Sequence, residues 1–312
     1  MESIAFVSNK KKHHYWIFGL TILFLLIGFI LFKIPQGFGR SNMLPNIKKF
    51  NNNSNIDMLK ELNEDWRFPS EYTRENIKIG DMDAYWVYAG EQETDKIILQ
   101  LHGGAYVNSL QENGTQYERA AVKYAEISGA RILTIDYRVA PKAPYPAALE
   151  DAVTAYEWLL KQGYDSEKII IAGDSAGGGL TLATAMYLRD NKIPMPAALI
   201  TMSAWTDLNY KNRKVSYVGD HDATNPYISP IYGDFTGLPP MLLQVGEEEK
   251  LLKDTLKVEE KAIKEGVSVT RTTYDKMFHV FQLLYPRLAE ANDAWDEVKL
   301  FIEAIYSSAN NR

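Results

Sequence analysis

Along most of the chain, short apolar runs alternate with longer segments in which apolar residues recur every three or four positions. The short runs have the length and composition of buried β-strands: 96–101, 131–136, 168–172, 197–202, 241–245 and 269–274. The longer segments have helical spacing: 115–127, 146–162, 180–189, 252–265 and 287–307. Residues 77–88 are typical of a β-hairpin that turns at Gly80-Asp81. This alternation predicts an α/β protein with a doubly wound, mainly parallel sheet, whose ligands lie at the carboxyl ends of the strands.

The N-terminal region departs from this pattern. Residues 15–32 carry no charge and are flanked by three lysines at 10–12 and by Lys33. Such a run can cross a bilayer, exceeds the apolar region of a signal peptide, and is followed by no small-x-small cleavage site. The pattern favours an uncleaved membrane anchor over residues 1–34. Because lysines directly precede the run, it also favours a cytoplasmic N-terminus and an extracytoplasmic main domain.

Residues 35–66 connect this anchor to the rest of the chain. The first part is polar and rich in turn formers, ending in an asparagine run at 51–55. Residues 56–66 have helical spacing, so the segment is predicted to be a linker followed by a short, cap-like helix. Residues 67–312 are long enough for one large α/β domain.

Composition narrows the function classes. The 312 residues include no cysteine, which excludes disulfides, thiolate zinc sites and a cysteine nucleophile. The net charge is −6, but residues 1–49 carry seven basic side chains against one acidic and stand at +6, which leaves −12 for the remainder. An acidic domain of this kind is not expected to bind nucleic acid.

The most informative stretch is Gly173-Asp174-Ser175-Ala176-Gly177, between a predicted strand and a predicted helix. This G-x-S-x-G pattern is typical of a nucleophile elbow, in which flanking glycines let strand and helix approach while the turn exposes the serine hydroxyl. The helix N-terminus also directs free N–H groups toward the same place. Ser175 is therefore the candidate nucleophile.

A second motif, His102-Gly103-Gly104-Ala105-Tyr106, follows the strand at 96–101. Paired glycines let backbone N–H groups turn toward a site at the sheet edge. Together with the N–H of Ala176, those of Gly103 and Gly104 are predicted to form an oxyanion hole.

Five histidines are available as a general base. His13 and His14 flank the apolar run, and His102 belongs to the glycine turn. His279 follows the last predicted strand by a short loop, where this type of site has its histidine, whereas His221 is assigned a structural role. His279 is the candidate base.

The acid that orients the histidine should follow the strand at 241–245. Gly246 is followed there by Glu247, Glu248 and Glu249. Asp254, at the start of the next predicted helix, is the runner-up, since it could equally serve the helix dipole.

These motifs together resemble the hormone-sensitive-lipase-like family of α/β-hydrolases, in its bacterial esterase and lipase branch. The resemblance covers about residues 75–305 and rests on H-G-G-A at 102–105, D-Y-R-V-A-P at 136–141, Y-P-A-A at 145–148 and G-D-S-A-G-G at 173–178. It implies that residues 67–312 form an α/β-hydrolase catalytic domain. In the family's G-x-x-D-x-L motif the acid position is occupied here by Glu249.

The sequence departs from the family in one further respect. Only residues 209–224 lie where the family usually inserts part of a helical cap, so a reduced cap is expected and cap-dependent substrate preferences do not carry over. The resemblance implies a serine carboxylic-ester hydrolase for short to medium acyl esters, with a triad of Ser175, His279 and Glu249 and no cofactor or metal. Two alternatives stay open: an amidase of the arylformamidase type, and a membrane-tethered binding protein without activity.

Overall fold

The computed structural model describes residues 66–90, 94–284 and 288–309. The predicted anchor (1–34) lies outside these ranges, as does the predicted linker with its helix (35–66) apart from Trp66. Within the described ranges, none of the helices has both the length and the apolar character that crossing a bilayer requires. The anchor and the domain boundaries therefore remain predictions.

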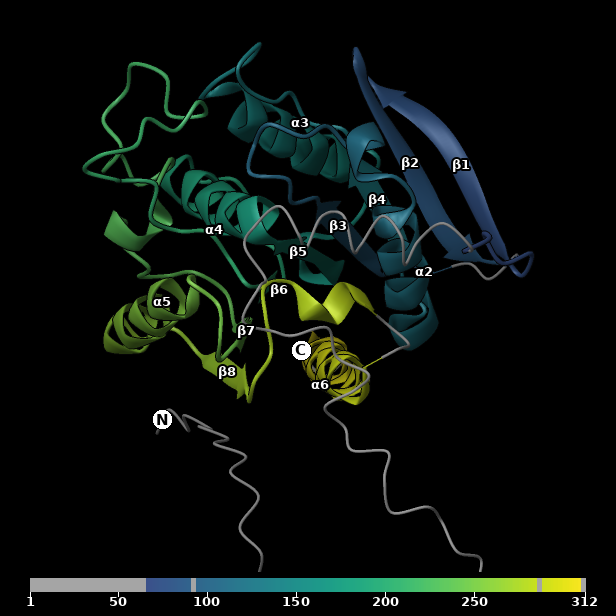
Figure 1. Ribbon diagram of the computed structural model, residues 1–312. Coiled ribbons are helices and arrows are strands. Elements are labelled where there is room, and N and C mark those ends of the chain that lie inside the picture. The colour runs from purple at the N-terminus through teal and green to yellow at the C-terminus, as the bar shows by residue number, and fades with distance from the viewer. Residues whose placement is uncertain (1–65, 91–93, 285–287, 310–312) are drawn as a thin grey trace, which may run out of the picture.

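One eight-stranded sheet organises the described chain (Figure 1), in the order β1-β2-β4-β3-β5-β6-β7-β8. The strands are β1 Tyr72–Ile79, β2 Met82–Ala89, β3 Ile97–Leu101, β4 Arg131–Ile135, β5 Ile169–Asp174, β6 Ala198–Met202, β7 Met241–Gly246 and β8 Val269–Tyr274. β1 and β2 form the predicted hairpin, β2 pairs antiparallel with β4, and every other pairing is parallel. The predicted mainly parallel α/β-hydrolase sheet is confirmed.

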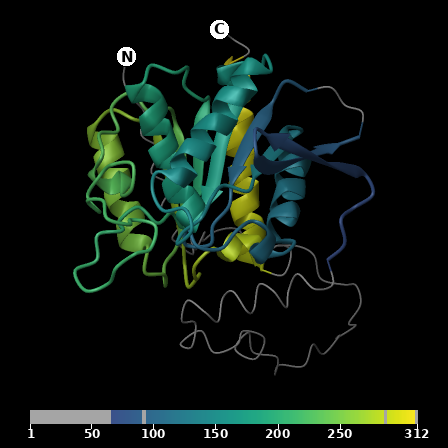
Figure 2. The same ribbon diagram turned by 90° about the horizontal axis from the view of Figure 1, so that it is seen from above.

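Helices cover both faces of this sheet, as Figures 1 and 2 show. The α-helices are α2 Gln116–Ser128, α3 Ala147–Lys161, α4 Ser175–Asp190, α5 Leu252–Lys264 and α6 Ala289–Ala309. Short 3-10 helices are η3 Gln111–Asn113, η4 Ser166–Lys168, η5 Pro230–Tyr232 and η6 Phe281–Leu284. Buried side chains of α3, α4 and α5 share one core cluster, and those of α2 and much of α6 share a second. A small third cluster joins Ala291 and Ala294 of α6 to Met277, Phe278 and Phe281.

The strand sequences explain why each face of the sheet carries a large core cluster. Successive side chains of a strand point to opposite faces, so a strand covered on both sides is apolar at most of its positions. In β3, Ile97 and Leu99 belong to the α3–α4–α5 side, and Ile98 belongs to the α2–α6 side. β5 alternates in the same way through Ile169 and Ile170. These continuous apolar runs made the strands recognisable in the sequence.

The start of one helix differs from its prediction. The helix expected from Leu180 begins five residues earlier, at Ser175, and includes Gly177, Gly178 and Gly179. Three glycines have poor helix propensity, but here they are what lets α4 lie against the neighbouring chain. A Cβ at Gly178 would come within 2.9 Å of Ala204 Cβ, and one at Gly179 within 2.2 Å of Trp205 O. Close packing therefore outweighs propensity at this helix start.

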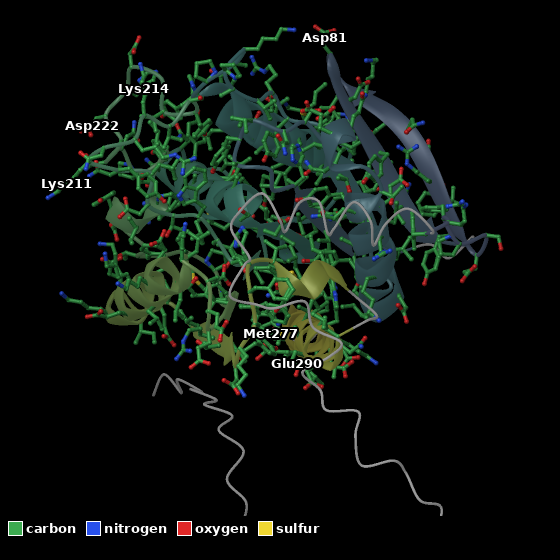
Figure 3. The ribbon with its side chains drawn as sticks, viewed as in Figure 1. Asp81, Lys211, Lys214, Asp222, Met277 and Glu290 are labelled. Atoms are coloured by element: carbon green, nitrogen blue, oxygen red, sulfur yellow. The ribbon has the colours of Figure 1, made fainter. Side chains whose placement is uncertain are left out.

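The segment at 209–224, where the family usually has part of its cap, contains turns and neither a helix nor a strand. Lys211, Lys214 and Asp222 mark it at the periphery of the molecule in Figure 3. The segment thus supplies no helical cover of its own.

Candidate active site

Ser175 lies at the junction of β5 and α4, in a turn that requires glycine two positions before it and two positions after it. Its φ is +51°, an unusual value for a residue with a side chain. A Cβ at Gly177 would approach Leu101 O to 2.1 Å, and one at Gly173 would approach Gly177 O to 2.3 Å. Both distances are impossible for real atoms, so the two glycines permit the close approach of β3, β5 and α4. The turn leaves the serine at the carboxyl edge of the sheet.

His279 reaches this serine from the loop after β8. Its Nε2 lies 2.9 Å from Ser175 Oγ, and its Nδ1 lies 2.7 Å from Glu249 Oε2. An ionised carboxylate can only accept hydrogen bonds, so Nδ1 carries the proton and Nε2 is left to accept from the serine hydroxyl. The three side chains form a continuous hydrogen-bonded line across more than 100 residues of sequence.

Glu249 is held firmly at the end of this line. Its side chain is 1% exposed, whereas that of His279 is 29% exposed. Besides the imidazole bond, its Oε1 accepts hydrogen bonds from Gly246 N at 2.6 Å and from Ser203 Oγ at 2.8 Å. These hydrogen bonds replace the water that a buried carboxylate loses.

The other acidic candidates point elsewhere. Glu247 and Glu248 are exposed, and Glu247 accepts a hydrogen bond from Lys276 N. Asp254 accepts from Asp207 N at 3.3 Å, and burial raises its pKa to about 6. Among the three glutamates and this aspartate, Glu249 is the one that contacts His279.

Neither of the other two described histidines makes a hydrogen bond to Ser175 Oγ. His221 is exposed and packs edge-to-face against Tyr145. His102 is completely buried, stacks on Tyr137 at a centroid distance of 4.0 Å, and donates from Nδ1 to Gly103 O. Burial lowers the pKa of His102 to about 4, so it is neutral at ordinary pH. Tyr137 also donates to His102 O, which fastens the glycine turn to the D-Y-R segment.

The glycine turn departs from the prediction at one donor. The Gly103 N–H donates to Tyr117 Oη at 2.5 Å, so it is already engaged by the protein. An N–H that faces a protein acceptor is a weaker candidate for an oxyanion donor than one that faces none. Gly104, Ala105 and Tyr106 all have positive φ, which rotates successive peptide units at this point. Among the described residues, the N–H groups of Gly104, Ala105 and Ala176 donate to no protein acceptor.

Asp174, next to Ser175, also supports the glycine turn. It is 6% exposed and accepts a hydrogen bond at 3.1 Å from the same Tyr117 hydroxyl that holds Gly103. Burial raises the pKa of Asp174 to about 7, against the opposing effects of the Tyr117 bond and of His279. Tyr117 thus connects α2, the glycine turn and the nucleophile elbow.

Comparisons with known proteins agree with this geometry. The chain matches the family described as alpha/beta hydrolase fold over residues 98–218 and 214–283. It is 36% identical over 246 residues to an acetyl-hydrolase of Streptomyces hygroscopicus, a match that spans 72% of this chain and 81% of that protein. An esterase of the bacterial hormone-sensitive lipase family superposes with a TM-score of 0.70 at 32% identity, covering 80% of this chain and 96% of the other. The chain belongs to the hormone-sensitive-lipase-like α/β-hydrolases.

A second solved structure supports the same family membership. EstE5, soaked with p-nitrophenyl butyrate, superposes on this hydrolase with a TM-score of 0.73 at 34% identity, covering 86% of this chain and 96% of that one. The predicted family and enzyme class, a carboxylesterase- or lipase-like hydrolase, are confirmed.

Three residues at the site of this hydrolase were not found from the sequence. Tyr117 lies within a helix and Ser203 directly follows β6, so neither belongs to a recognised motif. Ser203 at least had a positional signal, because polar residues just past parallel strands lie at the ligand-binding edge. Ala105 was included in the glycine motif but was not assigned a donor role.

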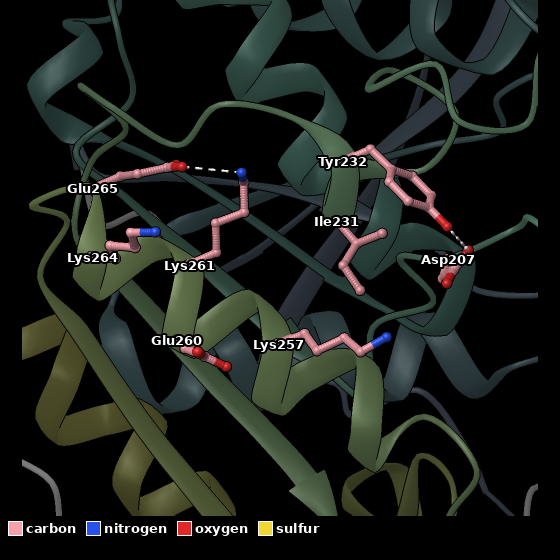
Figure 4. A pocket seen from close by; sticks show the side chains of 8 residues that line it. All are labelled: Asp207, Ile231, Tyr232, Lys257, Glu260, Lys261, Lys264 and Glu265. Atoms are coloured by element: carbon pink, nitrogen blue, oxygen red, sulfur yellow. Dashed lines mark hydrogen bonds and ion pairs between the residues drawn. The ribbon is translucent and has the colours of Figure 1, made fainter.

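One cavity of this hydrolase, of about 320 Å³, lies along α5 (Figure 4). Its charged lining residues are Asp207, Lys257, Glu260, Lys261, Lys264 and Glu265. Lys261 pairs with Glu265 at 3.0 Å, and Tyr232 donates to Asp207 at 3.2 Å. Acidic and basic side chains balance here, and none belongs to the Ser175 site. Within the described ranges, no group of three His, Asp or Glu residues could hold a metal ion.

Proposed function

We propose that this hydrolase cleaves carboxylic esters, with Ser175 as nucleophile, His279 as general base and acid, and Glu249 as the residue that orients the imidazole. The observation that carries the proposal is the hydrogen-bonded line from Ser175 Oγ through His279 to Glu249. Nucleophile, base and orienting acid in this geometry are the requirements of acyl transfer through a serine.

The reaction follows from these contacts. Ser175 Oγ attacks the acyl carbon while His279 Nε2 takes its proton, and the imidazolium then returns that proton to the departing alcohol. Water repeats the sequence on the acyl-enzyme and releases the acid. Glu249 keeps the proton on Nδ1 and stabilises the imidazolium, which is why its burial and its three hydrogen bonds matter.

We assign the oxyanion hole to the N–H groups of Gly104, Ala105 and Ala176. The support for this assignment is that these donors have no protein acceptor among the described residues, whereas Gly103 does. Ala176 also lies in the first turn of α4, where the helix dipole favours negative charge. Each donor of this type contributes about 2.7–4 kcal/mol to transition-state stabilisation.

The test is covalent labelling with a serine-directed fluorophosphonate, followed by turnover of p-nitrophenyl esters and of matched aryl amides. Labelling at Ser175 with ester turnover is the expected result. Absence of labelling would favour a binding protein without activity, and faster turnover of the aryl amides than of the esters would favour the amidase alternative.

A short acyl group is the expected substrate class. One relative is named an acetyl-hydrolase, and EstE5 was soaked with a butyrate ester. Because residues 209–224 form no helix or strand, the methylenes of a long chain lack the apolar cover that is worth about 0.8 kcal/mol per buried CH₂. In a series of p-nitrophenyl esters, we expect kcat/KM to be highest for short and medium chains and to fall beyond them. A clear preference for long chains would contradict this expected substrate class.

We further propose that residues 1–34 anchor the hydrolase in a membrane with its catalytic domain outside the cytoplasm. The support is the uncharged run at 15–32 and the lysines before it. Full-length protein is expected to stay in the membrane fraction after carbonate extraction, and a variant without residues 1–34 to be recovered in the soluble fraction with unchanged activity on water-soluble esters. Extraction of the full-length protein by carbonate would overturn the anchor.

A further inference from the structure

Ser203 occupies an unusual position directly after β6. It is fully buried, and its φ is +53°. A non-glycine residue in this region costs energy and persists only where its surroundings hold it. Its own N–H donates to Gln244 O at 2.7 Å, which ties it to the neighbouring strand β7. The backbone at Ser203 is therefore held in place between β6 and β7.

The Ser203 hydroxyl makes two hydrogen bonds, one to each of two separate loops. It donates to Glu249 Oε1 at 2.8 Å and accepts from Val280 N at 3.1 Å. Glu249 belongs to the loop after β7, and Val280 directly follows His279 in the loop after β8. One hydroxyl, with one proton to donate and a lone pair to accept, thus connects the acid with the base.

Val280 shows why this connection matters for His279. Its φ is +55°, which is a marked outlier for a β-branched residue. The conformation next to the histidine is therefore strained, and the Val280 N–H is held in place by Ser203 Oγ. Loss of that acceptor would leave a buried N–H unpaired and weaken the restraint on the imidazole.

We propose that Ser203 is a positioning residue, which holds Glu249 and His279 in register through its hydroxyl. This inference rests on the proposed function. Without the hydroxyl, Glu249 Oε1 keeps only the Gly246 N–H, so one of the two restraints on this oxygen is lost and the carboxylate is held less firmly against Nδ1. The histidine loop loosens at the same time, so both partners of the bond that fixes the imidazole lose a restraint.

The experiment compares kcat and KM for a p-nitrophenyl ester in full-length wild type, Ser203→Ala and Ser203→Gly. Because a hydrogen bond to a charged group is lost at the acid, we expect kcat to fall about 10- to 100-fold while KM changes less than about threefold. Glycine adopts positive φ without strain, so Ser203→Gly is expected to fold at least as well as Ser203→Ala and to show the same loss of kcat.

Ser229→Ala is the matched control. Ser229 is also completely buried, and its hydroxyl accepts from a backbone N–H, that of Leu208, at 2.9 Å, with no contact to the Ser175 site. This control loses a buried hydroxyl of the same kind and should keep wild-type kcat. A loss of kcat in Ser229→Ala equal to that in Ser203→Ala would overturn the proposal.

A double-mutant cycle separates positioning from general destabilisation. In a Glu249→Gln background, Ser203→Ala should cost less than about threefold in kcat, because the carboxylate that it positions is already gone. The same factor in both backgrounds, or a Ser203→Ala kcat within about twofold of wild type, would refute the proposal. Ser175→Ala tests the proposed function separately: if that variant is inactive and Ser203→Ala is fully active, the positioning role alone is wrong.

Discussion

Ser175→Ala is expected to remove ester hydrolysis, with kcat lower by about 10⁴- to 10⁶-fold, while the fold stays intact. The nucleophile is lost, but the turn depends on Gly173 and Gly177, whose Cβ atoms could not be accommodated. Alanine has the same backbone requirement as serine at φ +51°, and a methyl group fits where the hydroxymethyl group lay. Turnover of p-nitrophenyl acetate by purified variant, with thermal unfolding measured on the same preparation, checks both halves of this expectation.

Ser308→Ala is a suitable control for that measurement. Ser308 is exposed on α6, and its hydroxyl bonds only to Ile305 O within the same helix. It should show wild-type turnover and unfolding. If purified Ser175→Ala retained turnover well above the uncatalysed rate, Ser175 would not be the nucleophile, and the proposed function would fail with it.

The strands and helices of the described chain were predictable because their patterns are strong. Each of β3 to β7 is a short, mostly apolar run, as expected of strands covered on both faces. The edge strand β8 is different, because four of its six residues are polar and only Val269 and Thr272 are buried. The start of α4 was predicted too late, since propensity disfavours Gly177 to Gly179, and the close packing that requires glycine there exists only in the folded chain.

The part of the candidate site that depends on the order of motifs along the chain was predictable. An elbow, a glycine turn and a histidine after the last strand can be placed by position along the sequence, and they point to Ser175, Ala176 and His279. The hydrogen bond from the Gly103 N–H to Tyr117 could not be predicted, because Tyr117 lies in a helix that carries no recognisable motif. Ser203 and its two partners are likewise brought together only by the parallel order of β6, β7 and β8.

Backbone strain gathers at the same edge of the sheet. Of the seven non-glycine residues with positive φ in the described ranges, five lie at this edge: Ala105, Tyr106, Ser175, Ser203 and Val280. Such conformations cost about 1–3 kcal/mol each and persist where surrounding structure enforces them. Each of these residues lies in, or beside, a group that we assign to the reaction. These strained conformations lower the stability of the folded hydrolase, but they fix the assigned groups before substrate binds, which agrees with rate enhancement by preorganisation.

Glu249→Gln is expected to lower kcat by about 10⁴-fold, because an amide facing His279 Nδ1 favours the wrong imidazole tautomer. Glu247→Gln and Glu248→Gln should each change transition-state stabilisation by well under about 1 kcal/mol, since both side chains are exposed. Asp254→Asn is also expected to keep activity, because its carboxylate accepts from Asp207 N and does not contact His279. The four variants are compared by kcat for one ester at matched stability.

The pH dependence of the free energy of unfolding tests the raised pKa of Asp254 independently of catalysis. Burial raises its pKa to about 6 from an ordinary value of 3.8, so the folded state disfavours the ionised carboxylate, and the cost grows as pH rises from about 4 through 6. Asp254→Asn removes that cost, and at pH 8 the variant should be no less stable than wild type.

The activity comparison has one outcome that would contradict the assignment of Glu249. If Glu249→Gln kept nearly full activity while Asp254→Asn lost it without unfolding, the acid of this site would be Asp254, and the contact between Glu249 and His279 would be structural only.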